Sequence, residues 1–152
     1  HPKGTIVITK IVVHITDSPQ GRGDDAADIH RWHQEKGFTG IGYHYVITEA
    51  GEVQAGRPEY WQGAHVKGHN DGSIGVALVA DRKLSRQQRT ALYELLIELC
   101  GRHPRAIVYG HRDLDASKRC PGFSVSKFLE EMRQERLTIQ NIQRNQHDQR
   151  DW

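Results

Sequence analysis

The stretch Ile11-Val12-Val13-His14-Ile15 decides the fold prediction, because β-branched residues dominate it and a histidine stands near its end. Such a run is typical of a strand that is buried on both faces of a sheet. The strand-favouring composition begins at Ile6, and Lys10 is interpreted as a break within it. We therefore expect a buried strand that carries a histidine to its end, where the chain enters a loop.

Helix and strand patterns alternate along the rest of the chain. Residues 26–36 form a predicted helix that Gly37 stops. A second helix begins at the capping box of Ser85 and Gln88 and ends at Gly101 and Pro104. Its apolar face has helical spacing and consists of Leu92, Leu95, Leu96, Leu99 and Cys100.

Further elements complete one α/β domain. Strands are expected at 43–47, 52–55, 73–80 and 106–109, the first two as a hairpin. A loop follows from 110 to 123, and a last helix begins near Ser124. This alternation predicts a single α/β domain with a central mixed β-sheet flanked by helices.

Length, charge and cysteine content exclude several classes of protein. The 152 residues are enough for one domain, and 21 basic against 19 acidic residues give a formal net charge of +2. This balance gives no support for nucleic-acid binding. No apolar run approaches the roughly 20 residues of a membrane-spanning helix, and two cysteines exclude a disulfide-dense scaffold. A monomer is the expected state.

The two ends of the chain differ from the body. The chain begins His1-Pro2 instead of with methionine, so we expect that upstream residues have been removed; no signal peptide remains in the sequence. At the other end, residues 133–152 are rich in Gln and Asn. We predict a domain over 1–132 and a polar tail over 133–152 that is either a helical extension or disordered.

Three residues from separate parts of the chain could form a metal site: His14, His111 and Cys120. Imidazole and thiolate are ligands that zinc prefers, and three protein ligands with an open fourth position are typical of a catalytic site. A disulfide between Cys100 and Cys120 is the alternative that would exclude this site. The apolar helix face around Cys100 favours inert packing instead.

The other histidines have simpler explanations. His65 and His69 are four residues apart, but Gly68 lies between them and the glutamate of a helical zinc motif is missing. His30 and His33 are interpreted as packing residues of an amphipathic helix around Trp32. His103 closes a helix, where a cation suits the helix dipole.

Four segments in this order resemble a known family: VVHIT (12–16), RWHQEKGFTGIGYHYVI (31–47), GAHVKGHNDGSIGVALV (63–79) and GHRDLDASKRCPGF (110–123). Together they resemble the zinc-dependent N-acetylmuramoyl-L-alanine amidases of the bacteriophage lysozyme type, which share a fold with peptidoglycan recognition proteins. The resemblance covers about residues 6–130. It implies the amidase fold for the domain and leaves the tail outside it.

The resemblance also implies roles for individual residues. The zinc ligands would be His14, His111 and Cys120, the last being characteristic of the phage branch. The catalytic residues would be Tyr43 and Lys118, for which strand packing and a solvated loop charge are the simpler alternatives. The expected substrate contacts are His65, Asn70 and Ser73, of which the last two could equally be structural. Asp113 and Asp115 are candidates for orienting the ligands, although aspartate is also common in turns.

The implied function is hydrolysis of bacterial peptidoglycan. Zinc-activated water would cleave the amide bond between N-acetylmuramic acid and the L-alanine of the stem peptide. The alternatives are a non-catalytic peptidoglycan-binding module and a phage regulatory protein that binds a polymerase. The protein would act on the cell wall after synthesis in a host cytoplasm, if it is a phage endolysin, or after export, if an upstream segment directs it.

Overall fold

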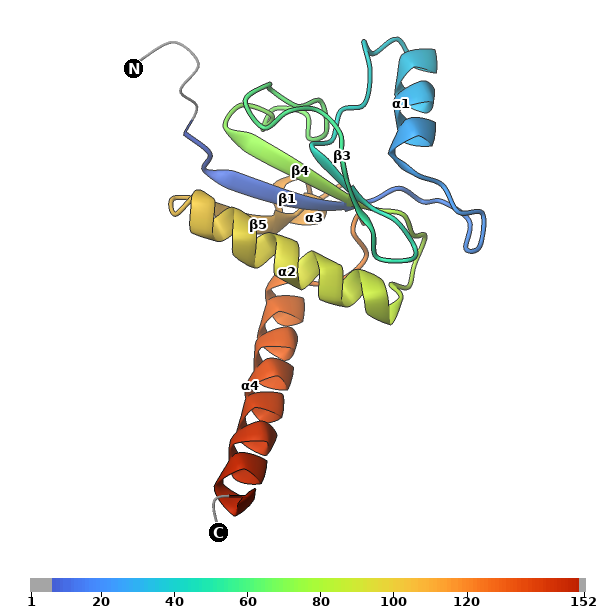
Figure 1. Cartoon of the computed structure of the whole chain (residues 1–152). Coiled ribbons are helices and arrows are strands. Elements are labelled where there is room, and N and C mark those ends of the chain that lie inside the picture. The colour runs from blue at the N-terminus through green and yellow to red at the C-terminus, as the bar shows by residue number, and fades with distance from the viewer. Residues whose placement is uncertain (1–6, 151–152) are drawn as a thin grey trace.

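A computed structural model describes residues 7–150 of the chain, which form one mixed five-stranded sheet with four helices (Figure 1). The strand order is β3-β2-β4-β1-β5; β3 runs antiparallel to β2, and all other neighbouring pairs are parallel. The strands are β1 (Lys10–Ile15), β2 (Tyr45–Ile47), β3 (Val53–Ala55), β4 (Ser73–Leu78) and β5 (Ile107–Gly110), and the helices are α1 (Ala26–Glu35), α2 (Arg86–Arg102), α3 (His111–Leu114) and α4 (Val125–Arg150). The predicted α/β class and mixed sheet are confirmed.

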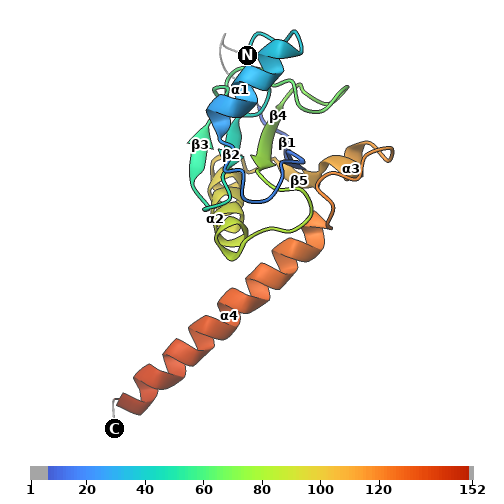
Figure 2. The ribbon, with the colours of Figure 1, turned by 90° about the vertical axis from the view of Figure 1, so that its right-hand side faces the viewer.

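Different helices cover the two faces of the sheet (Figure 2). Ile11 and Val13 pack in the larger apolar cluster with α2 and the first turns of α4. Ile29 of α1 packs in a smaller cluster on the opposite face. Successive residues of a strand point to opposite faces. His14 therefore points away from α2, toward the face on which α1 lies.

Local signals in the sequence predicted the helix starts correctly. Ser85 Oγ accepts a hydrogen bond from the Gln88 N–H, and Gln88 Oε1 accepts one from the Ser85 N–H, which is the expected capping box of α2. Asp25 and Asp28 form the equivalent pair at the start of α1. The hairpin of β2 and β3 is also confirmed.

Two expectations about the elements are wrong. The strand was expected from Ile6 with a break at Lys10, but Lys10 is its first residue; Ile6 lies outside the described residues. The reason is the partner strand: Lys10 pairs with Ser73, where β4 begins, so residues 7–9 have no strand to pair with on that side. The segment after β5 was expected to be loop and begins instead with the four-residue α3. Asp113 stabilises this turn by accepting a 2.7 Å hydrogen bond from the N–H of Gly110.

Residues 133–150 continue α4 as a helix that projects from the domain (Figures 1 and 2). Arg136 still reaches α2, where it forms an ion pair with Glu94, whereas residues 137–149 are exposed. Leu137, Ile139 and Ile142 are among these exposed side chains. In the part of the chain that the structure describes, none of the helices has the length and apolar character needed to span a bilayer.

One carboxylate ties the loop after β3 to the body of the domain. Glu59 forms an ion pair with Arg102 at 2.8 Å and a contact with His103 Nε2 at 2.7 Å, both at the end of α2. The hydroxyl of Tyr45 in β2 donates a further hydrogen bond to it. Burial raises the pKa of Glu59, but the hydrogen bonds from Tyr45, His103 and Arg102 outweigh burial and hold the pKa below its usual value.

Replacing Glu59 by glutamine is expected to lower the free energy of unfolding by about 1 kcal/mol at pH 7. A carboxylate whose pKa is lower in the folded state stabilises the protein above its unfolded-state pKa, and this contribution is lost as the pH falls through the folded-state pKa. The difference between the two proteins should therefore shrink below about pH 4.5. Urea unfolding of both proteins at pH 7 and pH 3 measures this difference in the free energy of unfolding. An equal difference at the two pH values would contradict this account.

Candidate metal centre

The register of the sheet places two histidines side by side. In the parallel pair of β1 and β5, Val13 lies opposite Gly110, so the next residues, His14 and His111, leave this pair of strands together. Their ring centroids are 4.7 Å apart. Because β5 ends at Gly110 while β1 continues to Ile15, the end of β1 is open on this side for a residue from another segment.

That residue is Cys120, from the loop after α3. The N–H of Ile15, beyond the end of β5, donates a hydrogen bond to Cys120 Sγ at 3.1 Å. The N–H of Arg112 donates to the carbonyl of Cys120 at 2.7 Å. Glycine is required at position 110 because a Cβ there would lie 2.9 Å from Cδ of Pro121. Backbone contacts therefore hold the thiol beside the two histidines.

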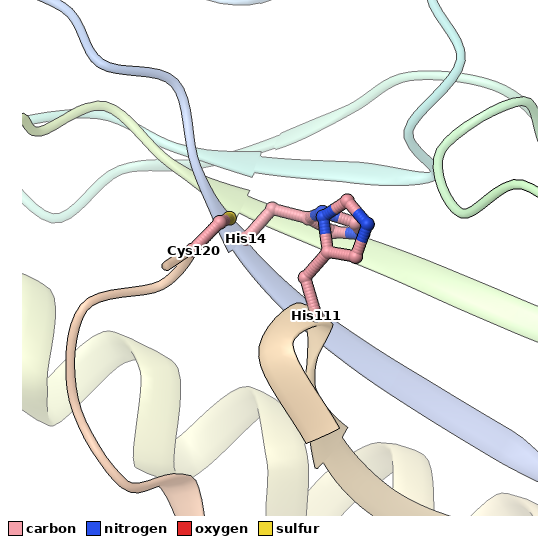
Figure 3. A group of neighbouring side chains, drawn as sticks. All are labelled: His14, His111 and Cys120. Carbon is pink, nitrogen blue, oxygen red and sulfur yellow. The ribbon is translucent and has the colours of Figure 1, made fainter. Parts of the chain in front are cut away.

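His14, His111 and Cys120 each bring one ligand atom to within 4.8 Å of the others (Figure 3). Two imidazoles and one thiol are a donor set that suits zinc, and in a tetrahedral zinc site the ligand atoms lie roughly 3.5 Å apart. The residues therefore fit a zinc ion after a modest contraction. Three ligands would leave one coordination position for water or substrate.

The protonation of the three residues is compatible with metal binding. Burial lowers the pKa of His14 well below its usual value, and the nearby His65 and His111 lower it further. Burial, followed by the charge of Lys118, also lowers the pKa of His111. Both rings are therefore neutral at pH 7, the form that binds metals. Burial raises the pKa of the Cys120 thiol to about 11, so a metal would have to displace its proton.

The sequence model of the N-acetylmuramoyl-L-alanine amidase family matches residues 4–123. The chain belongs to this family. The matched segment contains all three candidate ligands, and it ends before α4.

Endolysins of bacteriophages are similar to the chain over most of their length. An endolysin of Enterobacteria phage K11 is 34% identical over 129 residues, which cover 80% of this chain and 85% of the phage protein. An endolysin of Escherichia phage T7 is 34% identical over 128 residues, covering 79% and 84%.

The solved structure of the N-acetylmuramoyl-L-alanine amidase LysC from Clostridium intestinale URNW superimposes with a TM-score of 0.75 at 26% identity, covering 88% of this chain and 91% of that one. Drosophila PGRP-LB superimposes with a TM-score of 0.68 at 25% identity, covering 77% and 76%. The fold expected from the resemblance, shared by amidases and peptidoglycan recognition proteins, is therefore confirmed.

The two residues expected to be catalytic lie near the candidate ligands, Tyr43 against His14 and Lys118 at a cavity that Cys120 also lines. The ring of Tyr43, just before β2, is 5.1 Å from the ring of His14. Burial raises the pKa of Tyr43 well above its usual value, and Cys120 and Asp17 act in the same direction, so its hydroxyl stays protonated. Lys118 is exposed and lines a cavity of about 630 Å³ together with Cys120.

The residues expected to contact substrate lie deeper than the resemblance suggested. His65 Nδ1 is 2.9 Å from His14 Nε2, and His65 Nε2 is 3.2 Å from Ser73 Oγ, so both ring nitrogens have partners inside the protein. Ser73 is only 3% exposed. Asn70 Oδ1 accepts the N–H groups of His65 and Val66, each at 2.9 Å, which leaves its amide nitrogen as the group that could reach a ligand.

Several residues of the site were not found from the sequence. Asp17, Asp81, Arg82 and Arg119 also line the cavity beside Cys120. Asp17 has a positive φ of 57°, which is uncommon outside glycine. Its position two residues after the end of β1 was the available signal, because loops at the carboxyl ends of strands carry many sites in α/β proteins.

Asp113 and Asp115, the candidates for orienting the ligands, hold the turn that begins at His111, and the N–H of Asp115 donates to the carbonyl of His111 at 3.1 Å. Asp113 caps the N–H of Gly110, and Asp115 accepts hydrogen bonds from the backbone and hydroxyl of Ser117. Both cysteines are free thiols, and Cys100 packs against the apolar cluster beneath α2. Cys100 and Cys120 are therefore not joined by a disulfide, the alternative that would have excluded the metal site.

The helix histidines bind backbone instead of metal. His30 and His33 accept the N–H groups of Ile41 and Gly42 at 3.0 and 2.9 Å. His44, which was not singled out from the sequence, accepts the N–H of Gly75 at Nδ1 and donates from Nε2 to the carbonyl of Trp61. The bonds of His30 and His33 join α1 to the segment before β2, and those of His44 join Trp61 to β4.

Proposed function

We propose that the chain hydrolyses the amide bond between N-acetylmuramic acid and the L-alanine of the peptidoglycan stem peptide, with zinc held by His14, His111 and Cys120. The observation that carries the proposal is the approach of these three ligand atoms to within 4.8 Å of one another. Membership of the N-acetylmuramoyl-L-alanine amidase family supports the amide as the bond that is cleaved. The endolysin relatives support bacterial peptidoglycan as the substrate.

When bound, zinc supplies a Lewis acid that polarises a carbonyl group and makes water more acidic. Residues of the chain would stabilise the developing charge and position the water or transfer a proton. The ammonium group of Lys118, at the cavity beside Cys120, would stabilise the negative charge that develops on the carbonyl oxygen. The protonated hydroxyl of Tyr43 would hold the attacking water or pass a proton.

We also propose a substrate contact for Asn70. It lines a separate pocket of about 490 Å³ with Ser73 and Trp61, and its amide nitrogen remains available there as a hydrogen-bond donor. The Trp61 side chain is 57% exposed and offers an apolar face to the same ligand.

The proposal is tested by mass spectrometry of purified peptidoglycan after digestion, with and without a chelator. Release of stem peptides that begin with a free L-alanine amine, from glycan strands that stay intact, is expected from the metal-loaded protein. Chelation should stop the release, and added zinc should restore it. Undiminished release from a zinc-free sample would overturn the zinc mechanism. Binding to peptidoglycan without any release would identify a non-catalytic binding module.

A further inference from the structure

Two hydrogen bonds lead from His14 through His65 to the first residue of β4. His14 Nε2 lies 2.9 Å from His65 Nδ1, and His65 Nε2 lies 3.2 Å from Ser73 Oγ. We infer that His65, supported by Ser73, holds His14 in the tautomer that leaves its Nδ1 free to bind the metal. The inference rests on the metal site proposed above, and it makes His65 a positioning residue instead of a substrate contact.

The positions of the protons on the two neutral rings determine whether His14 can bind a metal. A neutral imidazole has one N–H group and one nitrogen with a free lone pair. If His14 Nε2 donates to His65 Nδ1, the lone pair of His14 Nδ1 is free for a metal. If His65 were the donor, the proton of His14 would sit on Nδ1 and its only lone pair would be used by His65. Metal binding and this hydrogen bond are therefore compatible in one tautomer only.

Ser73 completes the arrangement at the far side of His65. Once His65 Nδ1 acts as acceptor, the proton of that ring is on Nε2, which faces Ser73 Oγ at 3.2 Å. A serine hydroxyl accepts such a hydrogen bond. Ser73 lies in β4 opposite Lys10 of β1, so the support for His65 comes from the same pair of strands that carries His14.

The position of the His65 ring is fixed by close packing. A Cβ at Gly75 would lie 2.6 Å from the ring, as would one at Gly63, so the ring lies directly on the backbone of β4 and of its own loop. The side chain of Asn70 also fixes the backbone of His65 through a 2.9 Å hydrogen bond to its N–H. The ring therefore has little freedom to turn away from His14.

Because His14 is buried, its hydrogen bond to His65 is expected to matter for metal affinity. His14 is 1% exposed, so water cannot readily replace a lost acceptor at its Nε2, and an unpaired buried N–H is costly. Partners that orient a metal-binding histidine typically change metal affinity by about 10–100-fold. An effect of this size is expected for His65.

The test compares two substitutions in the full chain by competition for zinc with a chromogenic chelator, without substrate. His65→Leu removes the acceptor and should weaken zinc binding by about 10–100-fold. His65→Asn places an amide oxygen near the position of Nδ1 and should keep the affinity within about threefold of the parent. Equal weakening in both variants would mean that packing, and not the hydrogen bond, is responsible, and would overturn the inference.

A second measurement does not depend on variants. In the metal-free parent protein, nitrogen-15 NMR of the histidine rings should show His14 protonated at Nε2 and unprotonated at Nδ1. The opposite tautomer would overturn the inference even if zinc binds. The two proposals are distinguishable, because a parent protein that binds no zinc contradicts the proposed metal site, whereas tight binding by both the parent and His65→Leu contradicts only the role of His65.

Discussion

Replacing Cys120 by serine is expected to remove zinc from the protein and to abolish peptidoglycan hydrolysis. The thiol is one of three ligand atoms within 4.8 Å of one another, and a serine hydroxyl is not among the usual zinc ligands in proteins. Only His14 and His111 would remain, and two imidazoles hold zinc weakly. The zinc content should fall from about one ion to below about 0.1 per chain, and hydrolysis by at least about 1,000-fold.

The other cysteine provides the matched control. Cys100 is a free thiol that packs against the core beneath α2, so Cys100→Ala should retain zinc and activity while changing stability only modestly. Zinc is measured by elemental analysis after dialysis, and hydrolysis by the loss of turbidity of a cell-wall suspension. A Cys120→Ser protein that keeps its zinc and its activity would show that the thiol is not a ligand.

The two candidate histidine ligands could be proposed from the sequence because each lies at or just after the end of a strand pattern. His14 ends a buried β-branched run, and His111 follows a short apolar strand. The parallel register that aligns Val13 with Gly110 then brings the two histidines together. Cys120 follows no strand or helix pattern, since a loop and hydrogen bonds to Ile15 and Arg112 position it. Its residue type made it a candidate ligand, and the resemblance to the amidases then supported that assignment.

The role of His65 could not be read from the sequence, because it depends on contacts between distant segments. The resemblance to the amidases implied a substrate contact for His65, which lies in a glycine-containing loop of the sequence. The structure turns the ring inward onto Gly75, between His14 and Ser73. The nearest of these in sequence, Ser73, is eight residues away, and His14 is 51 residues away, so neither periodicity nor spacing indicates the arrangement.

Helix and strand boundaries could likewise be predicted where neighbouring residues determine them, and not where distant residues do. The start of α2 was predicted correctly because Ser85 and Gln88 cap it within four residues of chain. The predicted start of β1 was wrong because the first residue of this strand depends on where its partner β4 begins, at Ser73. The ion pairs of Glu59 with the end of α2 were not anticipated for the same reason, since they join residues more than forty positions apart.

Replacing Lys118 by alanine is expected to leave the zinc in place and to lower kcat by roughly 100-fold or more, with little change in KM. The side chain lines the cavity beside Cys120 but is not one of the three ligands. Its backbone N–H, which donates to the carbonyl of Asp115 at 3.0 Å, is kept in the variant, so the loop should retain its shape. Lys127→Ala, which removes an exposed lysine from the first turns of α4, is the matched control and should keep full activity.

The division between kcat and KM identifies what Lys118 does. A charge that acts on the oxyanion strengthens its interaction as the reaction proceeds, so removing it raises the barrier without weakening substrate binding. A lysine that only attracts the substrate would instead raise KM and leave kcat unchanged. Steady-state kinetics on a soluble muramoyl peptide, together with the zinc content of the same sample, separates these cases. Loss of zinc from Lys118→Ala would show that the residue supports the metal site, and unchanged kinetics would show that its charge is merely solvated.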